Sequence, residues 1–103
     1  MYYKKIFLIS AMCLTGTAAH AFNPPTMGWS SWNTFALNIN EEVIKSQADA
    51  MVATGLDKAG YKYINIDDGY WDGRAEDGHL RLNTKLFPSG MRSLVDYIHA
   101  KGL

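Results

Sequence analysis

The chain has 103 residues, of which ten are basic (Lys and Arg) and ten are acidic, so its formal net charge at pH 7 is zero. This balance gives no electrostatic reason to expect nucleic acid as a partner. The single cysteine, Cys13, lies in a segment that we expect to be removed, so the mature chain is predicted to fold without disulfides.

Residues 1–21 have the pattern of a secretory signal peptide. Lys4 and Lys5 precede an apolar run, Ile6–Leu14, and a stretch of small residues then ends at Ala21. A membrane anchor is the alternative, but the run is shorter than the roughly 20 residues that a spanning helix needs. We therefore expect cleavage before Phe22, export to the periplasm or the extracellular space, and no stable membrane insertion afterwards.

The next part of the chain predicts one strand followed by one helix. Residues Met27–Ser30 form the expected strand, and Ser31–Ile39 form the loop after it. Asn40 suits the N-cap position of a helix, and Gly55 suits the position just beyond its end. The apolar residues between them recur at helical spacing: Val43, Ile44, Ala48, Met51 and Val52.

A second strand and a long loop follow. The strand is predicted over Tyr61–Asp67 from its aromatic and β-branched content. The loop, Gly69–Leu86, has turn signals at Asp72-Gly73 and Asp77-Gly78. Within it, His79–Leu82 is expected to add a short strand to a local hairpin.

A second helix then completes an alternation of strands and helices. Pro88–Gly90 leads into it, Gly102 closes it, and Leu103 is expected to begin a third strand. Its core face has four residues at i, i+3, i+4 and i+7: Met91, Leu94, Val95 and Ile98. The alternation predicts an α/β fold with parallel strands, either a (β/α)8 barrel or a doubly wound sheet. The first strand-to-helix loop lacks the G-x-G-x-x-G phosphate motif of dinucleotide binders.

Two adjacent carboxylates, Asp67 and Asp68, are the strongest candidates for chemistry. They can form an acid/base pair, accept hydrogen bonds from hydroxyls, bind a metal, or simply occupy a surface turn before Gly69. Retaining glycosidases need two carboxyl groups roughly 5–5.5 Å apart. Neighbours on a regular strand point to opposite faces, so recognition of hydroxyls suits this pair better than bond cleavage. Because no His or Cys lies at ligand spacing, we expect no metal.

Four segments in register resemble the start of the α-galactosidase family of retaining glycosidases. Two are P-x-M-G-W-x-x-W-N at residues 25–33 and Y-x-Y-x-N-I-D-D at residues 61–68. Residues 85–91 and 96–103 add further agreement. The resemblance implies a (β/α)8 TIM barrel, with residues 22–103 as its first two βα units, truncated before the third strand. It implies no cofactor.

The resemblance also assigns a substrate-binding role to three residues. In this family the aspartate pair binds the 4- and 6-hydroxyls of galactose, a role that passes to Asp67 and Asp68. The second tryptophan of the first motif lines the sugar pocket near C6, which places Trp32 there and leaves Trp29 in the core or rim. Core packing is the alternative for both tryptophans. Trp71 follows the pair without an assigned role.

The resemblance implies that the nucleophile and the acid/base lie on later strands, beyond residue 103. We therefore expect the full-length protein to remove terminal α-linked galactose from oligosaccharides, polysaccharides or glycoconjugates with retention, while this chain carries only part of the sugar-binding subsite. Two alternatives within the family are an α-N-acetylgalactosaminidase and a β-L-arabinopyranosidase. An alternative of another class is a non-catalytic galactose-binding or inactive product.

Overall fold

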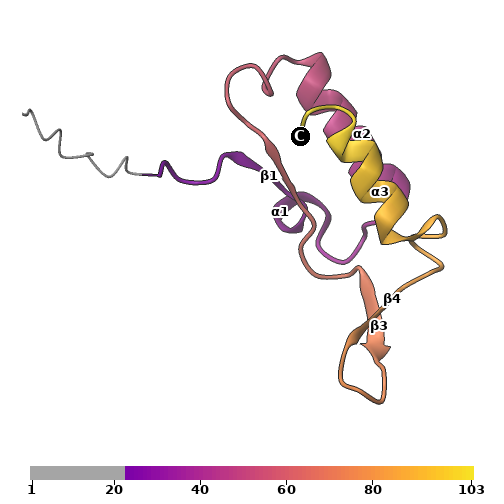
Figure 1. The fold of residues 1–103 in the computed structure, drawn as a ribbon. Helices are drawn as coiled ribbons and strands as arrows, with labels where there is room; N and C mark the ends of the chain where they lie inside the picture. Colours follow the sequence, from indigo (N-terminus) through magenta and orange to yellow (C-terminus); the bar gives the residue numbers. More distant parts are fainter. Residues whose placement is uncertain (1–22) are drawn as a thin grey trace, which may run out of the picture.

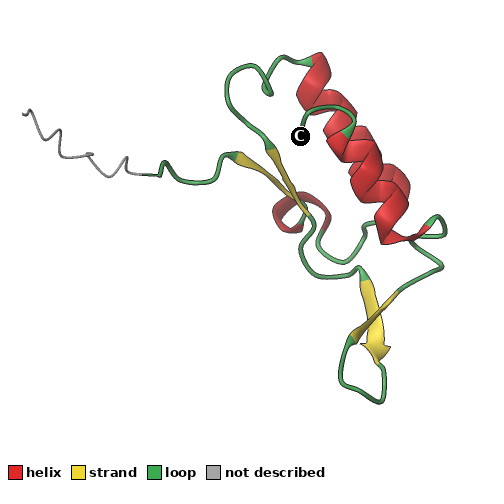
Figure 2. Cartoon of the chain, in the orientation of Figure 1, coloured by secondary structure: helices red, strands yellow, loops and turns green. Residues whose placement is uncertain are grey.

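The computed structural model describes residues 23–103, so the predicted signal peptide lies outside the described residues. Figures 1 and 2 show a mixed α/β arrangement with two helices packed side by side and a hairpin that projects from one end. In the described part of the chain, no helix has the length and apolar character needed to cross a bilayer. The elements in chain order are β1 (Gly28–Ser30), α1 (Trp32–Phe35), α2 (Glu41–Ala53), β2 (Tyr63–Asn65), β3 (Trp71–Arg74), β4 (Leu80–Leu82) and α3 (Gly90–His99).

β1 and β2 form a parallel pair, as the predicted alternation requires. Gly28 lies opposite Tyr63 and Ser30 lies opposite Asn65, with α2 connecting the two strands. A β-carbon at Gly28 would lie 2.3 Å from the carbonyl oxygen of Tyr63, so this position needs glycine for the strands to approach. The strand predicted over Tyr61–Asp67 is shorter in the structure because β1, its one partner among residues 23–103, has three residues.

Two local predictions are wrong. The segment Ser31–Ile39, predicted as a loop, contains the short helix α1, in which the backbone N–H of Phe35 donates to the carbonyl oxygen of Ser31. The Asp72-Gly73 pair, predicted as a turn, lies inside β3 at an irregularity of the antiparallel β3–β4 ladder. A glycine in a strand often marks such a bulge. The hairpin itself is confirmed.

The ends of α2 are stabilised as the sequence predicts. The side-chain oxygen of Asn40 accepts a hydrogen bond of 2.8 Å from the backbone N–H of Val43. At the other end Gly55 has a φ of 78°. The backbone N–H groups of Gly55 and Leu56 donate to the carbonyl oxygens of Val52 and Met51, respectively. This is a Schellman motif, which satisfies carbonyl groups that have no partner inside the helix.

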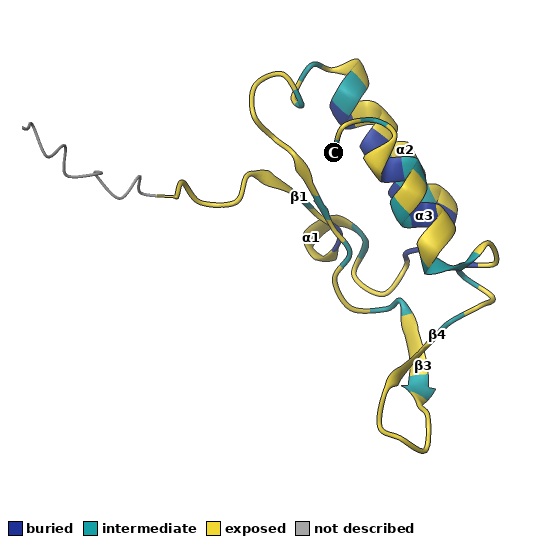
Figure 3. Cartoon of the chain, in the orientation of Figure 1, coloured by how far each residue is buried: buried dark blue, intermediate teal, exposed yellow. Residues whose placement is uncertain are grey.

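The hydrophobic core lies between the helices and one face of β2. Figure 3 shows buried positions gathered along α2 and α3 and mostly exposed strands. Ile64 and Ile66 of the second strand region pack against this core, whereas Tyr63 points away and is 53% exposed. Because side chains alternate along a strand, β2 has one covered face and one open face. The buried apolar residues of the cluster are Ile39, Ile44, Ala48, Phe87, Leu94 and Ile98.

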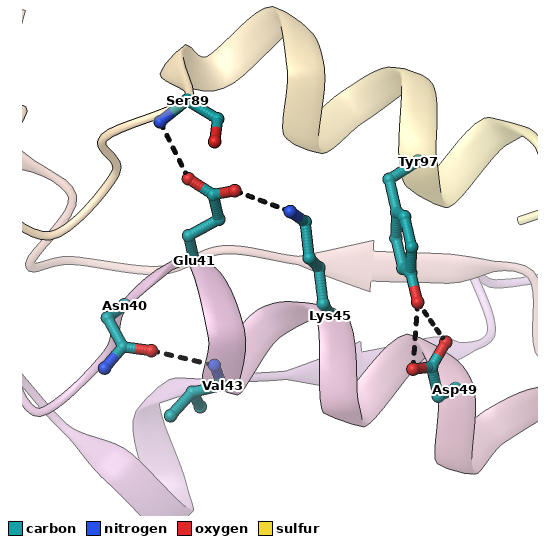
Figure 4. Close-up of polar contacts among 7 residues, drawn as sticks. All are labelled: Asn40, Glu41, Val43, Lys45, Asp49, Ser89 and Tyr97. Carbon is teal, nitrogen blue, oxygen red and sulfur yellow. Dashed lines mark hydrogen bonds and ion pairs between the residues drawn. The ribbon is translucent and has the colours of Figure 1, made fainter.

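A buried carboxylate joins the starts of the two long helices (Figure 4). Glu41 is only 6% exposed, and it accepts hydrogen bonds from Lys45 Nζ at 2.5 Å and from the backbone N–H of Ser89 at 3.0 Å. These donors, Lys45 first, lower the pKa of Glu41 from 4.5 to about 2. The carboxylate therefore links α2 to the segment that begins α3, 48 positions away in sequence.

A second polar contact joins the helices farther along (Figure 4). The Tyr97 hydroxyl donates to both carboxylate oxygens of Asp49, at 2.7 and 2.9 Å. Lys101 pairs with the same carboxylate and lies 4.5 Å from the centre of the Tyr97 ring, a cation–π contact. Lys101 and then Tyr97 lower the pKa of Asp49. The contacts of Glu41 with Ser89 and of Asp49 with Tyr97 together fix the relative positions of α2 and α3.

We expect Glu41→Gln to destabilise the natural protein near neutral pH but not at strongly acidic pH. The folded-state pKa of Glu41 lies below the ordinary pKa of a glutamate, 4.5, so ionised Glu41 stabilises the fold above about pH 4.5. That stabilisation is lost as the pH falls toward about 2. Urea-unfolding midpoints of wild type and variant should therefore converge over this interval. Glu42→Gln, in the same helical turn, is the control, and a Glu41→Gln deficit that is independent of pH would contradict the expectation.

We expect the isolated polypeptide 22–103 to lack a cooperative thermal transition. Both outer edges of the β1–β2 pair are unpaired within the described residues, and a two-stranded sheet is marginally stable in water. Large apolar side chains of this region, Met27 and Tyr63 among them, are exposed. Circular dichroism at low protein concentration tests this expectation. A sharp, reversible transition would show that this segment is a self-sufficient domain.

Candidate functional site

Polar residues gather where the two parallel strands end. The backbone N–H of Ser31 donates to the carbonyl oxygen of Asn65 at 3.2 Å, which continues the β1–β2 ladder by one step. Trp32 comes two residues after the end of β1, and Asp67 and Asp68 come just after the end of β2. The carboxyl ends of parallel strands are where α/β folds place ligand-binding residues.

Ser30, the last residue of β1, and Ser31, which follows it, both contact Asp67. The backbone N–H of Asp67 donates to the hydroxyl of Ser31 at 2.9 Å, and Ser31 is fully buried. The Ser30 hydroxyl donates to Asp67 Oδ2 at 3.5 Å, while Oδ1 accepts from the backbone N–H of Asp68 at 2.8 Å. Sequence reasoning missed both serines. Parallel pairing of the two predicted strands could have identified them, because it aligns Ser30 and Ser31 with the residues that end the second strand.

The side chain of Asp68 is held by residues that follow it closely in sequence. Its Oδ1 accepts from the backbone N–H of Gly69 at 2.7 Å and from the indole N–H of Trp71 at 2.8 Å. Its Oδ2 has no hydrogen-bond partner among residues 23–103. Gly69 has a φ of 102°, and a β-carbon there would lie 3.3 Å from Leu37 Cα. The glycine thus turns the chain directly after the carboxylate pair.

The two tryptophans of the first strand region have different surroundings. Trp29 packs against the core and lies edge-on to Phe35, with ring centres 6.1 Å apart. Trp32, the first residue of α1, is 43% exposed. No hydrogen bond joins it to either aspartate within the described residues, so it reaches the site only as the neighbour of Ser31.

The carboxylate pair lies on an open surface and not in an enclosed cavity: both aspartates are exposed. A hollow of about 380 Å³ lies elsewhere, between the starts of α2 and α3, where Glu41 and Lys45 line it. In residues 23–103 no group of three or more His, Cys, Asp or Glu side chains is placed to hold a metal ion. Two oriented, exposed carboxylates can accept hydrogen bonds from the hydroxyl groups of a ligand.

The chain is similar to known proteins of one family. Residues 24–103 match the family model described as Alpha galactosidase A. The chain is 54% identical over 79 residues to the α-galactosidase A of Cellvibrio japonicus and 55% identical over 80 residues to α-galactosidase 2 of Arabidopsis thaliana. Each match covers 77% of this chain and 20% of the relative.

A solved structure gives the same result at the level of the fold. The α-galactosidase of Saccharomyces cerevisiae with raffinose superposes with a TM-score of 0.71 at 42% identity, covering 75% of this chain and 17% of that one. The chain therefore spans about a fifth of the length of the relatives it matches. Since the family match extends over all described residues except Asn23, the chain belongs to the α-galactosidase A family.

Proposed function

We propose that residues 22–103 form the first two βα units of a (β/α)8 barrel. Two features support this: β1 and β2 are parallel with α2 between them, and α3 follows the second strand. The helices cover the face of β2 that includes Ile64, the opposite, open face carries Tyr63, and the two aspartates just beyond the strand are exposed. In a barrel that open face becomes the interior, and further strands pair with the free edges.

The proposed activity of the natural protein is hydrolysis of terminal α-linked galactose with retention, by double displacement. Oligosaccharides, polysaccharides and glycoconjugates are the proposed substrates. The single observation that carries the proposal is the placement of Asp67 and Asp68, both exposed and both oriented by hydrogen bonds at the carboxyl end of the strand pair. Family membership supplies the reaction.

The two aspartates are proposed to bind the sugar and not to break its bond. Ionised carboxylates accept strong, charge-assisted hydrogen bonds from hydroxyl groups, here the 4- and 6-hydroxyls of galactose. Trp32 presents an exposed ring that can cover the apolar C–H surface near C6. The nucleophile and the acid/base, roughly 5–5.5 Å apart in retaining enzymes, are proposed to come from later strands beyond residue 103.

The sugar preference follows from the same contacts. L-Arabinopyranose lacks C6, so it makes no contact through a 6-hydroxyl and leaves the region near Trp32 unfilled. N-Acetylgalactosamine differs at C2, which none of the three residues is proposed to bind. A panel of aryl glycosides of the three sugars separates an α-galactosidase from the two alternatives in the family. No turnover of any of them, together with galactose binding, would indicate a non-catalytic product.

We expect Asp67→Asn to lower kcat/KM on an aryl α-galactoside by about 10- to 100-fold. The substitution keeps the size of the side chain but removes a charged acceptor, which is worth ~1.5–3 kcal/mol. Steady-state kinetics of the natural protein provide the measurement. Asp96→Asn, an exposed carboxylate on α3, is the matched control and should leave the rate within twofold. An unchanged kcat/KM for Asp67→Asn would remove this residue from the sugar subsite.

We also propose that the protein is exported and that residues 1–21 are removed. N-terminal sequencing of the protein from the periplasm or the medium should then begin at Phe22. Ala21→Glu places a large charged residue at the cleavage position and should leave an uncleaved, membrane-associated species. A natural protein that retains Met1 and stays in the cytoplasm would show that the segment is not a signal peptide.

A further inference from the structure

We propose that Trp71 is a positioning residue that holds Asp68 in the orientation needed to accept a sugar hydroxyl. The inference rests on the proposed function, because it assumes that Asp68 binds substrate. Trp71 lies on β3, outside the strand pair that carries the aspartates. Its side chain nevertheless makes the one side-chain hydrogen bond to Asp68 within residues 23–103.

The hydrogen bonds at Asp68 divide its two oxygens into different roles. The Trp71 indole N–H and the Gly69 backbone N–H both donate to Oδ1, at 2.8 and 2.7 Å. An oxygen with two donors is close to saturated, and Oδ2 remains available to a ligand. The backbone bond comes from the neighbouring residue and permits rotation of the carboxylate plane. The indole N–H, from three residues away, fixes that plane.

The carboxylates of Asp67 and Asp68 are held by different donors. Within residues 23–103, the Ser30 hydroxyl donates to the Asp67 carboxylate at 3.5 Å and the Ser31 hydroxyl accepts from the Asp67 backbone N–H, and neither hydroxyl contacts Asp68. Two adjacent carboxylates repel each other, so a carboxylate without a fixed donor can rotate to other orientations. The Trp71 indole N–H restrains the Asp68 carboxylate without neutralising its charge.

The hairpin holds Trp71 itself in place. Trp71 pairs with Leu82 of β4, and Leu82 packs against the core between α2 and α3. Next to this pair, the backbone N–H of Asn83 donates to the carbonyl oxygen of Tyr70 at 2.9 Å. The base of the hairpin is thus anchored, although its tip extends away from the helices (Figure 1). Because Trp71 lies at this anchored base, its indole N–H is held in a fixed position relative to Asp68.

The test is a double-mutant cycle on the natural protein with Trp71→Phe, Asp68→Ala and the combined variant. Galactose affinity by calorimetry and kcat/KM on an aryl α-galactoside are measured for each. Trp71→Phe keeps the aromatic ring and removes the N–H donor, so we expect a loss of about 3- to 10-fold, as for one partly exposed hydrogen bond to a charged group. In the Asp68→Ala background the same change should cause no further loss.

A matched control separates positioning from loosening of the hairpin. Arg74→Ala removes a 2.7 Å hydrogen bond to the carbonyl oxygen of Gly78 near the hairpin tip, away from Asp68, and should change affinity by less than twofold. Equal losses for Arg74→Ala and Trp71→Phe would overturn the inference, as would additive losses in the cycle. If Trp71→Phe does not fold, Trp71→Tyr, which also lacks the indole N–H, replaces it.

The cycle also separates failure of this inference from failure of the proposed function. A weakened Asp68→Ala variant beside an unaffected Trp71→Phe variant would reject Trp71 as a positioning residue and leave the sugar subsite intact. A wild-type protein that neither binds galactose nor cleaves the galactoside would reject the proposed function, and the inference with it.

Discussion

The parallel pairing of β1 with β2 is the constraint on which the rest of the structure depends. Its register sets Ser30 opposite Asn65 and therefore places Ser31 beside Asp67, 36 positions apart in sequence. The close approach requires Gly28, where any β-carbon would collide with the facing strand. Without this pairing, neither serine could reach the carboxylate pair.

The helical layer supports that pair from one side only. Glu41 and Asp49 link α2 to α3 by contacts that each span 48 positions, and the apolar cluster between the helices covers Ile64 and Ile66. The opposite face of β2 has no such cover in the described residues. This asymmetry makes the chain rigid where the helices pack and leaves the functional surface open for other parts of a barrel to complete.

The site is built to orient carboxylates without neutralising them. The Ser30 hydroxyl, backbone N–H groups and one indole N–H are the donors to the carboxylates of Asp67 and Asp68, whereas the ion pairs of the described region involve other acids. A carboxylate paired with Lys or Arg would be a weaker acceptor for a neutral ligand. Neutral donors leave the full charge available, which suits recognition of sugar hydroxyls.

Local signals in the sequence predicted much of the fold. The Asn40 cap, the Gly55 terminus and the apolar spacing of both long helices predicted α2 and α3 closely, and Asp77-Gly78 correctly marked the hairpin turn. The family motifs also drew attention to Asp67 and Asp68. The cap, terminus, turn and apolar-spacing signals act over short stretches of chain, where residue type and spacing limit the backbone to few conformations.

Only the tertiary structure decided how the candidate site is held. The sequence did not predict α1, the shortness of β2, the Glu41–Ser89 contact, or the roles of Ser31 and Trp71. Strand length depends on the partner available, and the long-range contacts depend on which surfaces pack together. The sequence alone determined which residues can do chemistry here, and packing decided which of their atoms are restrained and which stay free for a ligand.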